Sequence, residues 1–308
     1  MNALDPKITV SELMVLDYEY KYTDAELWTD WARLKSVREF KTGSQFQPGI
    51  KLCQHFFPNF WDISNEKGEN FRTAWMNPVL MSEVLDWGRR SMSQLWLSWI
   101  RRAVYMRAGL PNSSFYRPHF SKQICQMTDK KYGVLFDPCA GWGGRLLGTV
   151  ANGWHYIGCE PNLQTYNNLK RMVEFLEVQD QVTLFNLPAE NYIPDPSTFT
   201  DYDVVLTSPP YFNLEVYTAD RAQSYNKHST YADWSENWFK PLMRSCLQRL
   251  TPGGLSCWNV MNFKKNDLVA DVFHVHENLT LDATVGFRSP LGNLRNIKNK
   301  DVTYVFRS

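Results

Sequence analysis

Two short segments of the chain carry residue types that bind and position small organic groups. The first, Asp137 to Arg145, reads Asp-Pro-Cys-Ala-Gly-Trp-Gly-Gly-Arg and lies between an apolar run and a helical pattern. Glycines in such a turn let a ligand approach the backbone, and the start of the next helix offers unpaired N–H groups. The spacing is neither that of a dinucleotide turn nor that of a P-loop. We therefore expect an adenosyl ligand without phosphates.

Glu160 ends the next apolar run, about 20 residues after the glycine turn, where an acidic side chain can accept hydrogen bonds from both hydroxyls of a ribose. The alternative is a surface carboxylate that caps the following helix. We favour the ribose because the glycine turn and the acid occur together.

The second segment is Ser208-Pro209-Pro210-Tyr211, which follows another apolar run. Consecutive prolines stiffen the backbone and remove two N–H donors, which leaves carbonyl groups free to accept hydrogen bonds. The Ser208 hydroxyl and the Pro209 carbonyl could hold an exocyclic amine while Tyr211 stacks on its ring. The alternative is an ordinary turn, since Pro-Pro often follows a strand.

The elements that must position these segments alternate along the second half of the chain. Short apolar runs bounded by turn residues predict strands at 133–137, 154–158, 182–185, 202–207, 255–260 and 301–307. Helical periodicity predicts helices at 144–151, 163–176 and 231–250. This alternation indicates an α/β fold with both segments at carboxyl ends of strands, where open α/β sheets bind ligands.

The first part of the chain lacks this alternation and is rich in Trp, Tyr and Phe. We expect helices at 24–40 and 79–107 and an irregular loop at 46–61, which contains Pro48 and Pro58. At 308 residues a second domain is usual. We therefore predict a mainly helical module over 1–110 and an α/β domain over 111–308.

Composition excludes several classes of protein. A hydrophobic fraction of 44% excludes intrinsic disorder, and 33 basic against 32 acidic residues give no global charge that would favour nucleic acid. The six cysteines show no metal-ligand or disulfide pattern, so we expect no metal. Without an apolar run of about 18 residues or a secretion signal, we expect no membrane span and a cytoplasmic location.

Together, the two segments resemble the amino-group DNA methyltransferases that use S-adenosylmethionine, over about residues 115–308. The family has a Rossmann-like class I methyltransferase sheet, mostly parallel with an antiparallel C-terminal strand. Glu160 matches its ribose-binding acid, and Ser208, Pro209, Pro210 and Tyr211 match its catalytic [DNS]-P-P-[YFW] tetrapeptide. By the same resemblance the cofactor contacts are Asp137, Pro138, Ala140, Gly141, Trp142 and Gly143, with Phe115 and Pro118 covering the methionine moiety. Either Asn186 or Glu190 would contact the adenine.

The resemblance implies transfer of a methyl group to a base amine, with S-adenosylhomocysteine as product and no covalent enzyme intermediate. Serine in the first place of the tetrapeptide is typical of enzymes that act on the cytosine 4-amino group, so Ser208 favours cytosine. The adenine 6-amino group is the alternative, followed by an RNA base amine or a catalytically silent nucleic-acid-binding subunit. A bacterial or phage restriction-modification enzyme is the expected setting.

The expected partner is DNA, single-stranded or with the target base flipped out of the duplex, which requires a basic surface. Candidates on the N-terminal helical stretch are Arg101 and Arg102, beside Arg89, Arg90 and Arg107, although these could equally form the solvated side of a buried helix. Further candidates are Arg221, Lys227 and His228 after the tetrapeptide, and Arg295, Lys298 and Lys300 near the C-terminus. We expect removal of residues up to about Gly109 to abolish DNA binding and to spare cofactor binding.

Overall fold

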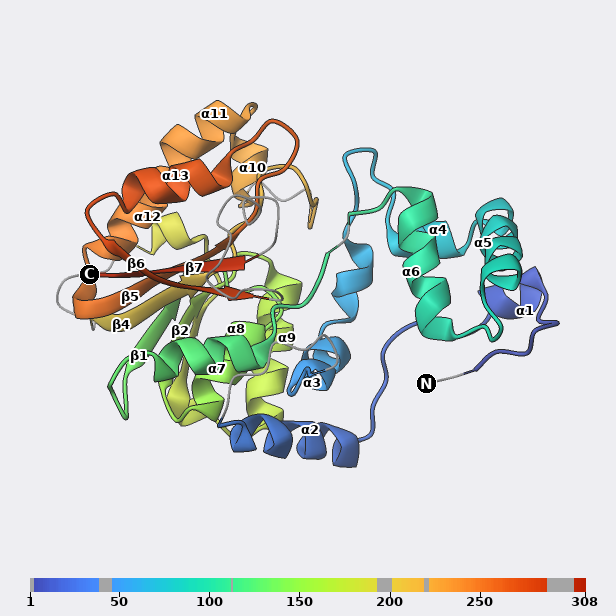
Figure 1. Cartoon of the computed structure of the whole chain (residues 1–308), viewed down its shortest axis with the longest axis horizontal. Coiled ribbons are helices and arrows are strands. Elements are labelled where there is room, and N and C mark those ends of the chain that lie inside the picture. Colours follow the sequence, from blue (N-terminus) through green and yellow to red (C-terminus); the bar gives the residue numbers. More distant parts are fainter. Residues whose placement is uncertain (1–2, 39–45, 112, 193–200, 219–221, 287–301) are drawn as a thin grey trace. The chain divides into compact units, whose positions relative to one another are not determined.

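The chain forms two compact units, each built from separate stretches of sequence (Figure 1). The computed structural model describes residues 3–38, 46–111, 113–192, 201–218, 222–286 and 302–308. Unit 1 comprises Met1–Lys21, Pro58–Ser114 and Asn213–Thr218, and unit 2 comprises Tyr22–Phe57, Phe115–Phe212 and Ala219–Ser308. This division differs from the expected boundary at residue 110, because Tyr22–Phe57 lies in unit 2 and Asn213–Thr218 lies in unit 1.

Unit 2 contains a sheet in the order β3-β2-β1-β4-β5-β7-β6. Strands β1 to β5 pair in parallel, and β7 is antiparallel to both β5 and β6. The bounds are Val134–Asp137, His155–Cys159, Val182–Phe185, Tyr202–Thr207, Leu250–Val260, Thr280–Gly286 and Val302–Arg307 for β1 to β7. This strand order, with β7 reversed, is the Rossmann-like class I methyltransferase sheet, so the expected fold class is confirmed.

Helices cover both faces of this sheet, as Figure 1 shows. One face carries α7 (Pro118–Gln126), α8 (Gly144–Ala151) and α9 (Leu163–Phe175), and the other carries α12 (Lys240–Leu247) and α13 (Leu268–Val275). Strand β4 is buried along its whole length, as expected for a central strand covered on both faces. Because β1 and β4 are parallel neighbours, the segments that follow them emerge at the same edge of the sheet.

Two N-terminal helices complete the core of unit 2. They are α2 (Asp24–Ser36) and α3 (Ile50–Phe56), and their apolar side chains join the buried cluster beneath α8 and α9: Leu27, Trp31, Leu34, Leu52, Cys53 and Phe56. Helix α2 ends at Ser36 rather than at residue 40, since the Lys122 ammonium donates hydrogen bonds to the carbonyls of Leu34 and Lys35. The expected loop at 46–61 was wrong, because Pro48 and Pro58 flank α3 instead of interrupting it.

Unit 1 is helical and held by aromatic packing. Its elements are α1 (Val10–Met14), η1 (Pro58–Asp62), α4 (Phe71–Trp75), α5 (Pro78–Ser91) and α6 (Leu97–Ala108). The rings of Trp61 and Phe71 lie 4.6 Å apart, and those of Phe71 and Tyr105 lie 4.9 Å apart. The single helix expected at 79–107 is two helices, which pack so closely that a Cβ on Gly88 of α5 would lie 2.8 Å from the Trp99 ring of α6.

Unit 1 also includes six residues that follow the tetrapeptide of unit 2. Asn213–Thr218 belongs to it, and Ser64 and Val216 exchange two backbone hydrogen bonds of 3.0 Å. The chain therefore passes from unit 2 into unit 1 directly after Phe212.

The remaining elements of unit 2 are α10 (Ser224–Lys227), α11 (Tyr231–Trp234), the π-turn η4 (Ser235–Phe239) and the short 3-10 turns η2 (Gln179–Gln181) and η3 (Ala189–Asn191). The helix expected at 231–250 thus consists of α11, η4 and α12 and ends at Leu247. Strand β6 was not predicted, because most of its residues are exposed or half-exposed and they show no apolar run. Among the described residues, no helix is long and apolar enough to cross a bilayer.

Candidate functional site

Asp137, the last residue of β1, organises the edge of the sheet. Its side chain is 0% exposed and accepts four hydrogen bonds. The donors are the Cys139 N–H (3.2 Å), Arg145 Nε (2.7 Å), the Tyr156 hydroxyl (2.8 Å) and the Thr207 hydroxyl (2.8 Å). A carboxylate has about four lone-pair sites, so all are used. We therefore expect Asp137 to shape the turn rather than to contact a ligand with its carboxylate.

The glycine turn is folded back against strand β2 and helix α8. The Ala140 N–H donates to the Cys159 carbonyl at 2.9 Å, and the Arg145 guanidinium donates to the carbonyls of Cys139 and Ala140. Gly143 has φ +72° and caps α8 without any side-chain hydrogen bond. The N–H groups at the start of α8 thus lack a side-chain cap, as a ligand-binding helix start requires.

Glu160 lies beside this turn at the end of β2. It is 8% exposed; one carboxylate oxygen accepts the Gly141 N–H at 2.9 Å, and the other accepts the Asn162 N–H at 2.9 Å. Burial raises the pKa of Glu160 to about 7, although the two backbone N–H groups act in the opposite direction. Each oxygen keeps one further lone pair, so the side chain can still accept two hydroxyl donors.

The segment that contains Phe115 and Pro118 lies against the start of α8. A Cβ on Gly144 would lie 2.0 Å from the Tyr116 carbonyl oxygen, and one on Gly148 would lie 2.0 Å from that of Pro118. Only glycine permits this approach. The rings of Phe115 and Trp142 meet edge to face at 5.5 Å. The structure thus brings Phe115 to the glycine turn and fixes Pro118 at the first turn of α7.

The tetrapeptide follows β4, beside the turn that follows β1. Ser208 and Pro210 are half-buried, and Pro209 and Tyr211 are buried. The Tyr211 hydroxyl donates to the Asn259 carbonyl of β5 at 3.1 Å, so the phenol anchors the loop to the neighbouring strand. The Thr207–Asp137 hydrogen bond joins the residue before Ser208 to the residue before the glycine turn.

The two residues that could contact an adenine differ in their surroundings. Asn186 donates its amide N–H to the Glu160 carbonyl at 2.8 Å, beside the ribose candidate. The Glu190 carboxylate is bonded to the Lys227 ammonium at 2.6 Å and to the Trp238 indole N–H at 2.9 Å. Of the two, Asn186 is the one that lies directly against Glu160.

The basic candidates lie in different surroundings. In unit 1, the Arg101 guanidinium donates to the Tyr18 carbonyl at 2.6 Å and covers the Tyr20 ring, whereas Arg102 is exposed. In unit 2, Lys227 is exposed and pairs with Glu190, and His228 Nδ1 lies 2.9 Å from the Asp233 carboxylate. Arg221, Arg295, Lys298 and Lys300 lie outside the described residues.

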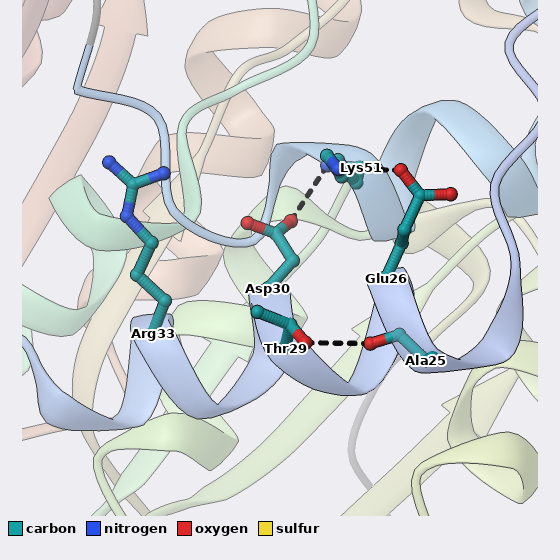
Figure 2. A pocket seen from close by; sticks show the side chains of 6 residues that line it. All are labelled: Ala25, Glu26, Thr29, Asp30, Arg33 and Lys51. Carbon is teal, nitrogen blue, oxygen red and sulfur yellow. Dashed lines mark hydrogen bonds and ion pairs between the residues drawn. The ribbon is translucent and has the colours of Figure 1, made fainter.

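A separate hollow of about 270 Å³ lies along α2, lined by Ala25, Glu26, Thr29, Asp30, Arg33 and Lys51 (Figure 2). Lys51 closes one side, since its ammonium lies 3.0 Å from Glu26 and its backbone N–H donates to Asp30 at 2.9 Å. None of its lining residues belongs to the glycine turn or the tetrapeptide. Over the described ranges, no group of three or more His, Cys, Asp or Glu residues could hold a metal ion.

The third of the chain that carries the tetrapeptide is similar in sequence to a known family. Residues 202–306 match the DNA methylase family model N6_N4_Mtase. The matched region runs from β4 to β7 and includes Ser208 to Tyr211, and it does not include the glycine turn. The resemblance to amino-group DNA methyltransferases that the sequence indicated is thereby confirmed for residues 202–306.

Solved structures similar to this chain include several methyltransferases. A precorrin-6y C5,15-methyltransferase from Geobacter metallireducens shares 13% identity over 62% of this chain and 85% of its own, with a TM-score of 0.39. A SAM-dependent O-methyltransferase from Thermotoga maritima shares 12% identity over 65% and 69%, with a TM-score of 0.43. A methyltransferase from Pyrococcus furiosus shares 13% identity over 64% and 85%, with a TM-score of 0.42. No curated relative matches the chain.

Sequence reasoning missed several residues that hold this site together. Thr207, Tyr156, Asn259 and Thr303 were given no role, because each lies in a strand and the strand pattern does not indicate which polar side chains meet across the sheet. Arg145 stood in the glycine segment but had no predicted role, and the structure gives it a buried ion pair with Asp137.

Proposed function

We propose that this protein transfers a methyl group from S-adenosylmethionine to the exocyclic amine of a base in DNA, with the cytosine 4-amino group as the preferred target. The proposal is carried by one juxtaposition. The glycine turn after β1 and the Ser208 tetrapeptide after β4 emerge from neighbouring parallel strands. The Thr207–Asp137 hydrogen bond of 2.8 Å joins the ends of these two strands. A ligand in the turn and a base at the tetrapeptide would therefore lie side by side.

The residues of the turn fit an adenosyl group. Glu160 offers two acceptor oxygens for the vicinal hydroxyls of a ribose, and the uncapped start of α8 offers N–H donors. Asn186, held at the Glu160 carbonyl, is the side chain best placed to reach an adenine ring, and Phe115 with Trp142 supplies an aromatic wall for the methionine moiety. When bound, the cofactor supplies an electrophilic methyl group on a sulfonium.

Ser208 and Pro209 would prepare the target amine. The lone pair of a nucleobase amine is delocalised into the ring, so the nitrogen is a poor nucleophile while it stays planar. Hydrogen bonds from the two amine N–H groups to the Ser208 hydroxyl oxygen and the Pro209 carbonyl would draw the nitrogen towards a tetrahedral geometry and localise the lone pair. Proximity of the two bound groups supplies much of the remaining acceleration.

The preference for cytosine rests on Ser208, since serine in this place is typical of enzymes that act on the cytosine 4-amino group. The adenine 6-amino group is the second candidate, because the matched family model, N6_N4_Mtase, is named for both the 6-amino and the 4-amino reaction. A base inside a duplex is inaccessible, so the substrate would be a flipped-out or single-stranded base.

Unit 1 is the candidate for target recognition. It is separate from the sheet unit, and its α5 and α6 carry exposed Arg90 and Arg102. The truncation expected to isolate the catalytic domain needs correction: removal of residues up to Gly109 would also remove α2 and α3, whose side chains fill the core of unit 2. Substitutions on unit 1 are therefore the appropriate test.

The deciding experiment incubates the full chain with labelled S-adenosylmethionine and unmodified DNA or RNA, digests the nucleic acid to nucleosides and identifies the labelled nucleoside by mass. 4-Methyl-deoxycytidine supports the proposal as stated. 6-Methyl-deoxyadenosine overturns the cytosine preference, and a methylated ribonucleoside alone overturns the DNA assignment. Failure to bind the cofactor in solution favours the silent nucleic-acid-binding subunit.

A further inference from the structure

Asn259 occupies a buried position next to the tetrapeptide. It is the penultimate residue of β5, and its side chain is 6% exposed in the neighbourhood of Ser208 and Tyr211. Its amide nitrogen lies 3.5 Å from Ser208 Oγ and 3.4 Å from the Tyr211 hydroxyl oxygen. Asn259 is thus a polar side chain whose contacts converge on the residues proposed to hold the base.

The other end of the Asn259 amide is held by the neighbouring strand. Thr303 is the register partner of Asn259 across β5 and β7, and it is 0% exposed. Its hydroxyl donates to Asn259 Oδ1 at 3.0 Å. This bond directs the amide oxygen towards β7 and therefore the amide N–H groups towards Ser208.

The series of hydrogen bonds begins at the cofactor side of the site. The hydroxyls of Tyr116 and Thr303 lie 3.0 Å apart. A threonine hydroxyl has one proton, and that of Thr303 is used on Asn259, so Tyr116 donates to Thr303. Tyr116 is itself fixed, because its backbone carbonyl packs against Gly144 at the start of α8.

We infer that Asn259 is a positioning residue for the methyl transfer, which holds the Ser208 oxygen as an acceptor and links it through Thr303 and Tyr116 to the cofactor segment. This inference rests on the proposed function. The Asn259 N–H donates to one lone pair of Ser208 Oγ, which leaves the second lone pair directed towards an incoming amine. Loss of that direction reduces the stabilisation of the transition state, because a displacement of a catalytic group by about 1 Å can reduce a rate about 100-fold.

Thr303→Val is the least disruptive test, since valine keeps the shape of threonine and removes only the hydroxyl. We expect kcat for base methylation to fall about 10-fold, with the dissociation constant for S-adenosylmethionine unchanged within about twofold. Thr149→Val is the matched control: Thr149 is also buried, and its hydroxyl is bonded within α8 to the Arg145 carbonyl at 2.8 Å. Its kcat should equal that of the wild type.

Asn259→Asp tests the direction of the bond to Ser208. An ionised carboxylate cannot donate, whereas a protonated one can, so at saturating cofactor the rate relative to wild type should rise as the pH is lowered from 8 to 6. A purely structural role predicts no such pH dependence. A relative rate that stays at the wild-type level, or that falls with decreasing pH, overturns the inference.

The same assay separates this inference from the proposed function. If the wild-type protein methylates a base amine and Thr303→Val retains the wild-type kcat, Asn259 has no positioning role and the function stands. If the wild-type protein binds the cofactor and methylates no base, the proposed function and the inference both fail. Thermal unfolding of each variant, measured alongside, confirms that the assay temperature lies below its transition.

Discussion

The Thr207 hydroxyl donates a hydrogen bond of 2.8 Å to the Asp137 carboxylate across two neighbouring strands. Each residue ends its strand: Thr207 directly precedes the tetrapeptide, and Asp137 is the first residue of the segment that contains the glycine turn. The bond therefore holds the points where the glycine turn and the tetrapeptide leave the sheet at a constant separation, which methyl transfer between two bound groups requires.

Asp137 and Arg145 form a buried ion pair whose disruption should destabilise the fold. Nε of Arg145 lies 2.7 Å from Asp137, and the two side chains are 6% and 0% exposed. Asp137→Asn leaves the guanidinium without its counter-charge, so we expect the free energy of unfolding to fall by about 3–5 kcal/mol. Urea denaturation measures the change. Lys51→Met, which breaks the exposed Lys51–Glu26 pair, is the control and should leave the urea midpoint near that of the wild type.

Cofactor binding should depend on pH through Glu160. Burial raises its pKa to about 7, and two ribose hydroxyl donors favour the ionised form, so binding releases a proton below pH 7. The dissociation constant should be about 10 times larger at pH 6 than at pH 8 and level above pH 8. Titration calorimetry across this range measures it.

Glu160→Gln should bind more weakly and show no such pH dependence, because an amide does not titrate. Glu174→Gln, at an exposed position on α9, should retain the wild-type profile. A wild-type dissociation constant that is the same at pH 6 and pH 8 would exclude Glu160 as the ribose acceptor.

Ser208→Ala should reduce turnover far more than cofactor binding. The substitution removes one acceptor of the target amine, and loss of one such hydrogen bond in other enzymes lowers kcat about 10²-fold to 10³-fold. Pro210→Ala should act in the same direction with a smaller loss, because it only loosens the loop. Single-turnover rates and cofactor dissociation constants give the comparison. Equal losses in both quantities would mean that the loop serves the fold rather than the reaction.

Exposed arginines of unit 1 should contribute to DNA affinity. Arg90 and Arg102 are exposed, and no ion pair is found for either within the described part of the chain. The double variant Arg90→Ala, Arg102→Ala should bind DNA more weakly whatever its sequence, with the slope of log affinity against log salt reduced by about 0.9 for each phosphate that the variant no longer neutralises. Lys131→Ala, an exposed cation of unit 2, is the matched control. Salt slopes that are the same in the double variant and the wild type would exclude these arginines as phosphate-binding residues.

The sequence by itself determined those features of the protein that depend only on residues close together along the chain. The strands β1 to β4, the glycine turn, Glu160 and the Ser208 tetrapeptide were all predicted, because short apolar runs and turn residues are local signals. Tertiary structure decided the rest. Tyr22–Phe57 lies in unit 2 and Asn213–Thr218 in unit 1, and Asp137 meets Thr207 while Asn259 meets Thr303. The Asp137–Thr207 and Asn259–Thr303 hydrogen bonds join residues that are distant in sequence. Only the strand order and the packing of helices on the sheet bring such residues together.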